Sequence, residues 1–300
     1  MPANSSQTKD RLSISPAKDS VAAAEVSLYR NVLRIKQEHA LVDLGISFYD
    51  AETTIQWSYN ADQYFHAAST MKLAVLLGVF RQVDRGELAL DAPVHVRNRF
   101  TSIVNQEPFM LDLGRDADPD VYGHLGKTLT VRELAYWMIT KSSNLATNLL
   151  VDVIGISTVQ HALDELDIDG VRVLRGVEDQ RAFDANLNNE VTANGLLKML
   201  RLIADGKAYS QKACEAMLEI MLEQQYRSGI PAGLPKAARV AHKTGNISTV
   251  HHDAGIVYLE GRKPYVLVIL TQFGADQSRG TAVADVSRDI FNTLAGNIDE

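Results

Sequence analysis

Ser69 and Lys72 are the first residues whose types and spacing could carry chemistry. At the start of a helix, residues three apart share a face, so the Lys72 amine would lie near the Ser69 hydroxyl. A serine hydroxyl is a weak nucleophile until a base takes its proton, and the free N–H groups of a helix N-terminus can hold an oxyanion. The same S-x-x-K pattern begins at Ser6 and Ser15, but only Ser69 opens an amphipathic helix, after two strands expected at about 42–48 and 55–59. Ser69 is therefore the candidate nucleophile.

Two further short motifs follow along the chain. Ser142-Ser143-Asn144 lies between two predicted helices, and Lys243-Thr244-Gly245 falls at the end of a predicted strand. Lys243 could offer a cation to an acidic substrate group, and Gly245 would let a substrate backbone lie close. Taken singly, the first motif is explained by a helix N-cap and the second by a strand that ends in a turn. All three motifs in this order favour catalysis.

The elements that must position these motifs are strands at both ends of the chain and helices between them. After a helix at about 21–37, Val42, Leu44, Ile46 and Phe48 alternate with polar or small residues, which indicates a strand with one buried face. The helix after Ser69 carries one apolar stripe. Further β-type runs are expected at 239–243, 254–259 and 264–272, with a terminal helix at about 281–294.

Four helix starts are also expected from capping residues. Thr130 and Glu133 form one capping box, and Ser157 and Gln160 are expected to form another. Thr192 and Ser210 are expected to precede two further helices. A sheet built from both chain ends around a helical insertion would place a cleft where the two parts meet, and functional sites tend to form at such interfaces.

Composition narrows the classes of function. The 300 residues carry 30 Lys+Arg and 37 Asp+Glu, a net charge of −7 without a basic block, which argues against nucleic-acid binding. The lone Cys214 excludes an internal disulfide and a cysteine-based zinc cluster. No apolar run reaches the roughly 18 residues that a membrane span requires. The cluster His251-His252-Asp253 is expected to be structural, because adjacent strand residues point to opposite faces.

The three motifs together resemble those of the serine penicillin-recognising superfamily, and most closely its class A branch. The segment Ser142–Leu150 resembles the class A S-D-N segment, with Ser143 in place of the usual Asp, and Leu187-Asn188 resembles the end of the E-x-x-L-N motif. The resemblance covers about residues 21–294. It implies an α/β fold (α+β by some schemes), with an antiparallel sheet flanked by helices plus an all-helical domain.

The expected domain boundaries follow from this resemblance and from the pattern of elements. Residues 1–18 would be a flexible tail. Residues 19–64 and 225–300 would form a discontinuous α/β domain. Residues 65–224 would form the helical domain, with an Ω-like loop near 175–190.

The resemblance also implies roles for the motif residues. Ser69 would be acylated, Lys72 would accept its proton, and Ser142, aided by Lys243, would relay a proton to the departing amine. Asn144 would hold the substrate's side-chain amide. The remaining expected substrate-binding residues are Thr244 and Gly245, with Asn246 completing an oxyanion hole and Asn188 helping to hold the deacylating water.

The Ω-like loop departs from the family pattern. The pattern has Glu three residues before Leu187, where this chain has Asp184. Aspartate is one methylene shorter, and a misplacement of about 1 Å can cost on the order of 100-fold in rate. We expect acylation to survive and deacylation by Asp184 to be slow. Nearby carboxylates that could act instead are Glu178, Asp179 and Glu190.

A second departure is the segment 99–127, which is about a dozen residues longer than in typical class A chains. It contains Asp112, Asp116, Asp118 and Asp120, together with Phe109 and Tyr122. These aspartates are expected to lie in a solvated loop, because the carboxylates of a calcium site are more closely spaced along the chain. The segment is expected to lie beside the cleft and to restrict what enters.

The leading functional interpretation is a serine hydrolase that opens a β-lactam ring, without a metal or cofactor and as a monomer. One alternative is a DD-peptidase, an esterase or a glutaminase-like acyl hydrolase. Another is a homologue that binds β-lactams and stays acylated. The polar residues 1–20 lack the apolar centre of a signal peptide. We expect a periplasmic or secreted protein if a signal was removed before Met1, and a cytoplasmic one if Met1 is native.

Overall fold

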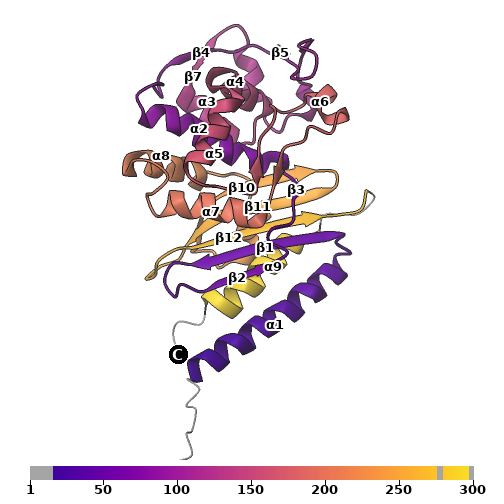
Figure 1. The fold of residues 1–300 in the computed structure, drawn as a ribbon, viewed down its shortest axis with the longest axis vertical. Helices are drawn as coiled ribbons and strands as arrows, with labels where there is room; N and C mark the ends of the chain where they lie inside the picture. The colour runs from indigo at the N-terminus through magenta and orange to yellow at the C-terminus, as the bar shows by residue number, and fades with distance from the viewer. Residues whose placement is uncertain (1–15, 276–279, 297–300) are drawn as a thin grey trace, which may run out of the picture.

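Strands from both ends of the chain pair in one sheet in the computed structural model, which describes residues 16–275 and 280–296 (Figure 1). Its five strands are antiparallel and run in the order β10-β11-β12-β1-β2. Their bounds are Asp43–Asp50 for β1, Gln56–Tyr59 for β2, Arg239–Ile247 for β10, Val250–Tyr258 for β11 and Tyr265–Gln272 for β12. The prediction of a sheet made from both chain ends is therefore confirmed.

One face of this sheet is covered by the two terminal helices, α1 (Pro16–Glu38) and α9 (Ala282–Ile290), with α9 continuing into the π-helical turn Phe291–Ala295. Leu44, Ile46 and Phe48 of β1 point into this layer and are buried, as their alternation predicts. Val42, the first residue of the predicted alternation, precedes β1 and is exposed, so its predicted burial is wrong. Of the expected flexible tail, residues 1–15 lie outside the described residues. Residues 16–18 belong to the first turn of α1.

The opposite face is covered as well, by α7 (Ala193–Ala204) and α8 (Gln211–Leu222). The expectation that β1 buries only one face is therefore wrong. Gly45 and Ser47 on the second face are also buried, and the Ser47 hydroxyl donates a 2.7 Å hydrogen bond to Asn194 of α7. A short polar side chain with a partner can occupy a buried strand position, and the alternation of polarity alone cannot distinguish it from an exposed one.

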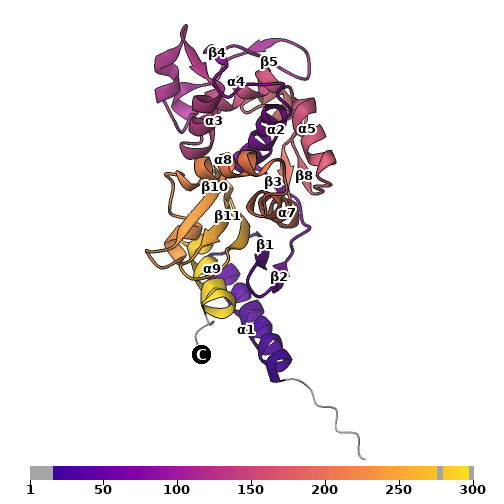
Figure 2. The same ribbon diagram turned by 90° about the vertical axis from the view of Figure 1, so that its left-hand side faces the viewer.

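A layer of helices lies beyond α7 and α8, on the side away from α1 (Figure 2). It comprises α2 (Lys72–Asp84), α3 (Val131–Thr140), α4 (Asn144–Ile154) and α5 (Ile156–Glu165). The residues of α2 from Lys72 to Phe80 are all buried, so this helix lacks the single apolar stripe expected of it. It packs against α4, α5 and α8, which cover it from several sides.

Short elements connect these layers. They are the three-stranded sheet β3-β9-β8 (Phe65–His66, Glu190–Val191, Val171–Arg172), the pairs β4-β7 (Pro93–His95, Thr128–Thr130) and β5-β6 (Phe100–Thr101, Pro108–Phe109), helix α6 (Gln180–Asp184), and the 3-10 turns η1 (Ala68–Met71), η2 (Leu113–Arg115), η3 (Asp120–His124) and η4 (Ile230–Gly233). None of the helices in the described ranges is long and apolar enough to cross a bilayer.

The capping predictions can be compared directly with the helix starts. Thr130 and Glu133 form the expected capping box at the start of α3. Thr192 and Ser210 cap α7 and α8 through their side chains, as predicted. The capping box predicted at Ser157 is wrong, because α5 already begins at Ile156, after Gly155.

Candidate active site

The candidate nucleophile, Ser69, lies in η1, which runs directly into α2. Ala68, the residue before it, has φ +44°, a left-handed conformation that is uncommon for a residue with a side chain. The Ala68 N–H donates to His66 Nδ1 at 3.1 Å, and the Thr70 hydroxyl donates to the Ala67 carbonyl at 2.6 Å. These bonds fix the turn that presents Ser69 to the cleft.

Ser142 lies between two lysine amines. Its Oγ accepts a 3.3 Å hydrogen bond from Lys72 Nζ and a 3.0 Å hydrogen bond from Lys243 Nζ. Lys72 also donates to the Ser142 carbonyl at 2.7 Å. Ser142 has φ +58°, a strained backbone that costs about 1–3 kcal/mol and persists where the surroundings impose it. The structure thus brings together three candidates that lie far apart in the sequence.

Both lysine side chains are fully buried, and this changes their proton affinity. Burial lowers the pKa of Lys72 to about 7, although the nearby carboxylates of Asp116 and Glu178 act in the opposite direction. Burial and the neighbouring Lys72 hold the pKa of Lys243 well below its usual range, against the attraction of Asp253. A lysine with a pKa near 7 is in large part an uncharged amine at neutral pH and can act as a base.

Asn144 links Lys72 to a carboxylate. Its Oδ1 accepts from Lys72 Nζ at 2.8 Å, and its Nδ2 donates to Glu178 Oε1 at 2.8 Å. The other oxygen of Glu178 accepts the backbone N–H of Asp112 at 3.1 Å. Glu178 has φ +59°, another left-handed residue at this site. Glu178 is therefore the carboxylate that a single side chain, Asn144, links to the candidate base Lys72.

Asp184 and Asn188, both expected in the site, lie elsewhere. Asp184 is exposed at the end of α6 and accepts a hydrogen bond from Gln180 at 2.8 Å. Asp184 does not line the cleft that Ser69 lines, whereas Glu178, six residues earlier, does. Asn188 accepts a hydrogen bond from Arg175 at 3.1 Å and does not line the cleft.

Asn189, which the sequence did not single out, holds the two ends of the Ω-like loop together. Its Oδ1 accepts the N–H groups of Leu174 and Arg175, and its Nδ2 donates to the Arg175 carbonyl at 3.0 Å. Asn148 of α4 does the same for Val177, pairing with both its N–H (2.7 Å) and its carbonyl (2.9 Å). These two asparagines fix the loop on either side of Glu178.

The Lys243-Thr244-Gly245 motif lies inside β10 rather than at a strand end, because β10 continues to Ile247. Lys243 Nζ donates to the Thr244 carbonyl at 2.9 Å in addition to Ser142. A Cβ on Gly245 would come within 3.0 Å of the Thr70 side chain and 3.2 Å of the Ala67 carbonyl. The glycine thus lets β10 approach η1, a packing requirement that the sequence did not predict.

A cleft of about 570 Å³ opens beside these groups. Ser69, Asn144 and Glu178 line it, so the candidate nucleophile faces the same space as the Glu178 carboxylate. The other described residues of its wall are His66, Ala68, Arg115, Arg175, Val177, Asp179, Gln180, Phe183, Asn189, Asn246, Ile247 and Ser248. Phe183 contacts His66 edge-on, with ring centroids 6.4 Å apart.

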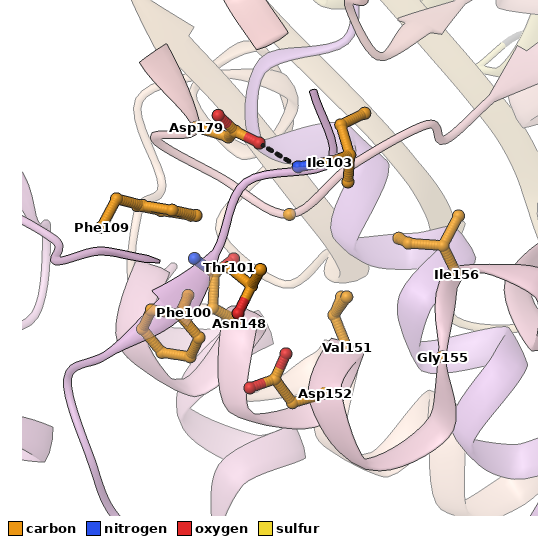
Figure 3. Close-up of a pocket in the computed structure, with 11 residues that line it drawn as sticks. Phe100, Thr101, Ile103, Phe109, Asn148, Val151, Asp152, Gly155, Ile156 and Asp179 are labelled. Carbon is orange, nitrogen blue, oxygen red and sulfur yellow. Dashed lines mark hydrogen bonds between the residues drawn. The ribbon is translucent and has the colours of Figure 1, made fainter. Parts of the chain in front are cut away.

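The segment 99–127 contacts the Ω-like loop beside a second cavity of about 270 Å³ (Figure 3). Residues of both the segment and the loop line this cavity. Asp179, the N-cap of α6, accepts hydrogen bonds from the Ser102 hydroxyl at 2.9 Å and from the Ile103 N–H at 3.0 Å. Phe100 and Phe109, with ring centroids 6.0 Å apart, form an apolar wall of this cavity. The expected role of the segment as a solvated loop is therefore incomplete.

The histidine cluster takes part in structural bonds. His252 Nε2 donates to the His66 carbonyl at 3.0 Å, while Asp253 is paired with His242 at 2.8 Å. Asp253 and His242 are both fully buried. Within the described ranges there is no group of three or more His, Cys, Asp or Glu residues that could hold a metal ion.

The chain is similar to known proteins over most of its length. Residues 27–294 match the model of the beta-lactamase enzyme family. A beta-lactamase from Bacteroides uniformis is 26% identical over 257 residues, which cover 79% of this chain and 81% of that protein.

Two solved structures are similar over nearly their whole length. The crystal structure of a beta-lactamase from Sphaerobacter thermophilus has a TM-score of 0.72 at 25% identity and covers 92% of this chain and 97% of its own. A mutant of PBP-A, solved as an acyl-enzyme complex with penicillin G, has a TM-score of 0.73 at 25% identity, with coverages of 90% and 97%. Together with the observed sheet, these similarities confirm the predicted fold class.

Proposed function

This chain belongs to the beta-lactamase enzyme family, and on that premise we propose that it is a serine hydrolase that opens β-lactam rings through an acyl-enzyme on Ser69. The observation that carries the proposal is the buried amine of Lys72, which bonds Ser142 and Asn144 next to a cleft lined by Ser69. A base, a proton relay and a nucleophile in one place are what acyl transfer to serine requires.

In the acylation step, neutral Lys72 keeps its two shorter hydrogen bonds, to the Ser142 carbonyl and to Asn144. Its lone pair takes the proton of the Ser69 hydroxyl as the serine oxygen attacks the lactam carbonyl. Burial favours the neutral amine, and the lowered pKa of Lys72 places that form at working pH. The backbone N–H groups of Ser69 and Asn246 are proposed to hold the developing oxyanion, as pre-oriented donors do in acyl transfer.

Collapse of the tetrahedral intermediate breaks the ring C–N bond, and the departing nitrogen needs a proton. Ser142 gives up its hydroxyl proton to this nitrogen and regains one from a neighbouring amine. Its oxygen already bonds both Lys72 and Lys243, so the return path is one hydrogen bond long. Lys243 and Thr244 are proposed to bind the substrate carboxylate, and Gly245 keeps their strand close to η1.

In the deacylation step, we assign Glu178 rather than Asp184 as the carboxylate that activates water. Glu178 borders the same cleft as Ser69, whereas Asp184 points to solvent. Asn144 Nδ2 carries two hydrogens, so it can donate one to Glu178 and the other to a substrate carbonyl. Slow turnover was expected because Asp184 is one methylene shorter than the family's glutamate. With Glu178 as the deacylating carboxylate, that reason no longer applies.

The experiment that tests this function combines hydrolysis of a chromogenic cephalosporin with intact-mass analysis of the protein. The proposal predicts rapid absorbance change and only a transient adduct, which is absent in Ser69→Ala. A permanent adduct without turnover would favour the non-hydrolysing binder. Neither adduct nor turnover, with cleavage of peptide or ester substrates instead, would favour the other acyl hydrolases.

A further inference from the structure

The carboxylate of Asp116 lies against the first turn of α4, although it belongs to the segment 99–127. Its Oδ1 accepts the backbone N–H of Asn144 at 2.9 Å, and its Oδ2 accepts that of Leu145, also at 2.9 Å. Asn144 and Leu145 are the first two residues of α4. The first N–H groups of a helix have no partner within it, and a negative charge is favourable at that end.

The local cap of α4 is weak by comparison. Ser143 is the N-cap residue, and its hydroxyl accepts a single hydrogen bond, from the Ala146 N–H at 3.3 Å. A neutral hydroxyl that accepts one hydrogen bond at 3.3 Å stabilises the helix start less than a carboxylate that accepts two N–H groups at 2.9 Å. Asp116 is thus the main group that satisfies the start of this helix.

The position that Asp116 fixes is that of the candidate catalytic groups. Asn144 reaches Lys72 with one end of its side chain and Glu178 with the other. Ser142, two residues earlier, has the strained φ of +58°. Such a conformation persists only where neighbouring bonds impose it, and the bonds to Asp116 hold the backbone two and three residues after Ser142.

Asp116 also contributes charge. Three charged groups act on the Lys72 amine: Lys243 of β10, Glu178 of the Ω-like loop and Asp116 of the segment 99–127. Two neutral residues also bond it, Ser142 and Asn144. Of the charged groups, Asp116 and Glu178 favour the protonated amine and oppose the effect of burial on its pKa. Removing one of these two carboxylates lowers the pKa of Lys72.

We propose that Asp116 is a positioning residue for hydrolysis, a carboxylate from the segment 99–127 that holds the start of α4 and thereby orients Asn144 and Ser142. The proposal rests on the function assigned above to those two residues. It gives the segment 99–127 a role in the reaction, where the sequence indicated only a loop that limits access.

The test compares Asp116→Asn with the matched control Asp120→Asn. Asparagine keeps the shape of the side chain but offers one acceptor where two N–H groups point, so one of the two bonds is lost. Asp120 belongs to the same segment, and its exposed carboxylate pairs with Lys141 at 2.5 Å. An exposed pair of this kind contributes little.

Two readouts separate positioning from a general effect on folding. In Asp116→Asn, kcat/KM should fall about 10- to 100-fold, the range expected for a lost hydrogen bond to a charged group. The acid limb of the pH profile of kcat/KM should move to lower pH, because losing the negative charge of Asp116 lowers the pKa of Lys72. Asp120→Asn should keep the parent values of both. A parent-like kcat/KM in Asp116→Asn, or a fall with an unmoved acid limb, would overturn the proposal.

Hydrogen–deuterium exchange gives a readout that needs no turnover. The peptide covering residues 142–146 should exchange faster in Asp116→Asn than in Asp120→Asn, and equal rates would contradict the proposal. If Asp116→Asn does not fold, Asp116→Glu keeps the charge and displaces it by one methylene. Asp116→Glu should leave the acid limb at the pH of the parent while lowering kcat/KM. An unchanged kcat/KM in this variant would contradict the proposal. A parent without β-lactam turnover rejects the proposed function alone, since the exchange comparison still tests Asp116.

Discussion

The side-chain amide of Asn144 donates a hydrogen bond of 2.8 Å to Oε1 of Glu178. The oxygen of the same amide accepts from Lys72 Nζ, also at 2.8 Å. One side chain therefore positions both the amine proposed to start acylation and the carboxylate proposed to complete deacylation. Substitutions at Lys72 and at Glu178 should therefore affect acylation and deacylation separately.

Glu178→Gln should acylate Ser69 and then hydrolyse slowly. The neutral amide cannot accept a proton from water, and general-base catalysis contributes about 10²–10⁴-fold. Stopped-flow mixing with a chromogenic cephalosporin should show a burst followed by a slow phase, and mass spectrometry should find the adduct accumulated on Ser69.

Asp184→Asn is the matched control for this prediction, since it makes the same chemical change in the same loop. Asp184 is exposed and bonded only to Gln180 among the described contacts, so its kcat should stay close to that of the parent. The reverse pattern, with adduct accumulating in Asp184→Asn and not in Glu178→Gln, would return the role to Asp184.

The pH dependence of kcat/KM should identify the acylation base. Lys72 must be neutral to accept a proton, and its pKa is lowered to about 7 by burial. Activity should therefore rise with pH through an acid limb near 7 and fall below it as Lys72 becomes protonated. A profile without an acid limb near 7 would contradict this role for Lys72. Lys72→Arg should lose activity across the range, because a guanidinium stays charged.

Gly245→Ala should disturb the nucleophile without adding a charge or removing a polar group. The new Cβ would meet Thr70 and the Ala67 backbone in η1, so the turn that carries Ser69 must shift. Overpacking of this kind costs about 1–3 kcal/mol of stability, and we expect kcat/KM to fall by more than tenfold. Thermal unfolding and acylation rates measure the two effects. Gly123→Ala, where nothing lies within 4 Å of the added Cβ, should behave like the parent.

The sequence predicted those parts of the fold that depend on local patterns. The capping box at Thr130, the cap at Thr192 and the strand whose Ile46 and neighbouring apolar residues are buried each follow from short-range chemistry, and each is present. It failed where a second layer covers an element. Ser47 is polar yet buried because α7 supplies Asn194 as its partner, and that helix lies far away in the sequence.

The same distinction applies to the site. Ser69, Lys72, Ser142, Asn144 and Lys243 were found by motif, and the structure brings them together. Glu178 was named only as a substitute for Asp184, because its place depends on a left-handed backbone and on α6, which spacing does not show. Asn189 and Asp116 act by accepting backbone N–H groups. Such bonds leave no spacing rule in a sequence.

His252 is fully buried and bonded on both ring nitrogens. Its Nδ1 accepts the Thr271 N–H at 3.0 Å, so the proton must be on Nε2, which donates to the His66 carbonyl. Burial lowers the pKa of His252 from 6.5 to about 3. The unfolded chain therefore binds this proton at a higher pH than the folded one does. Stability is unaffected by this group above pH 6.5 and falls as the pH drops from 6.5 towards 3, with a slope of up to about 1.4 kcal/mol per pH unit.

Urea unfolding between pH 7.5 and pH 4 measures this slope. His252→Gln should be less stable than the parent at pH 7.5 but should lose less stability on acidification, because the titrating group is gone while the carboxylates that also titrate are shared by both proteins. The control is His161→Gln, an exposed position whose curve should run parallel to that of the parent. Parallel curves for His252→Gln and the parent would show that the ring gains its proton at the same pH in the folded and the unfolded chain, which would contradict the buried neutral ring that bonds Thr271 and His66.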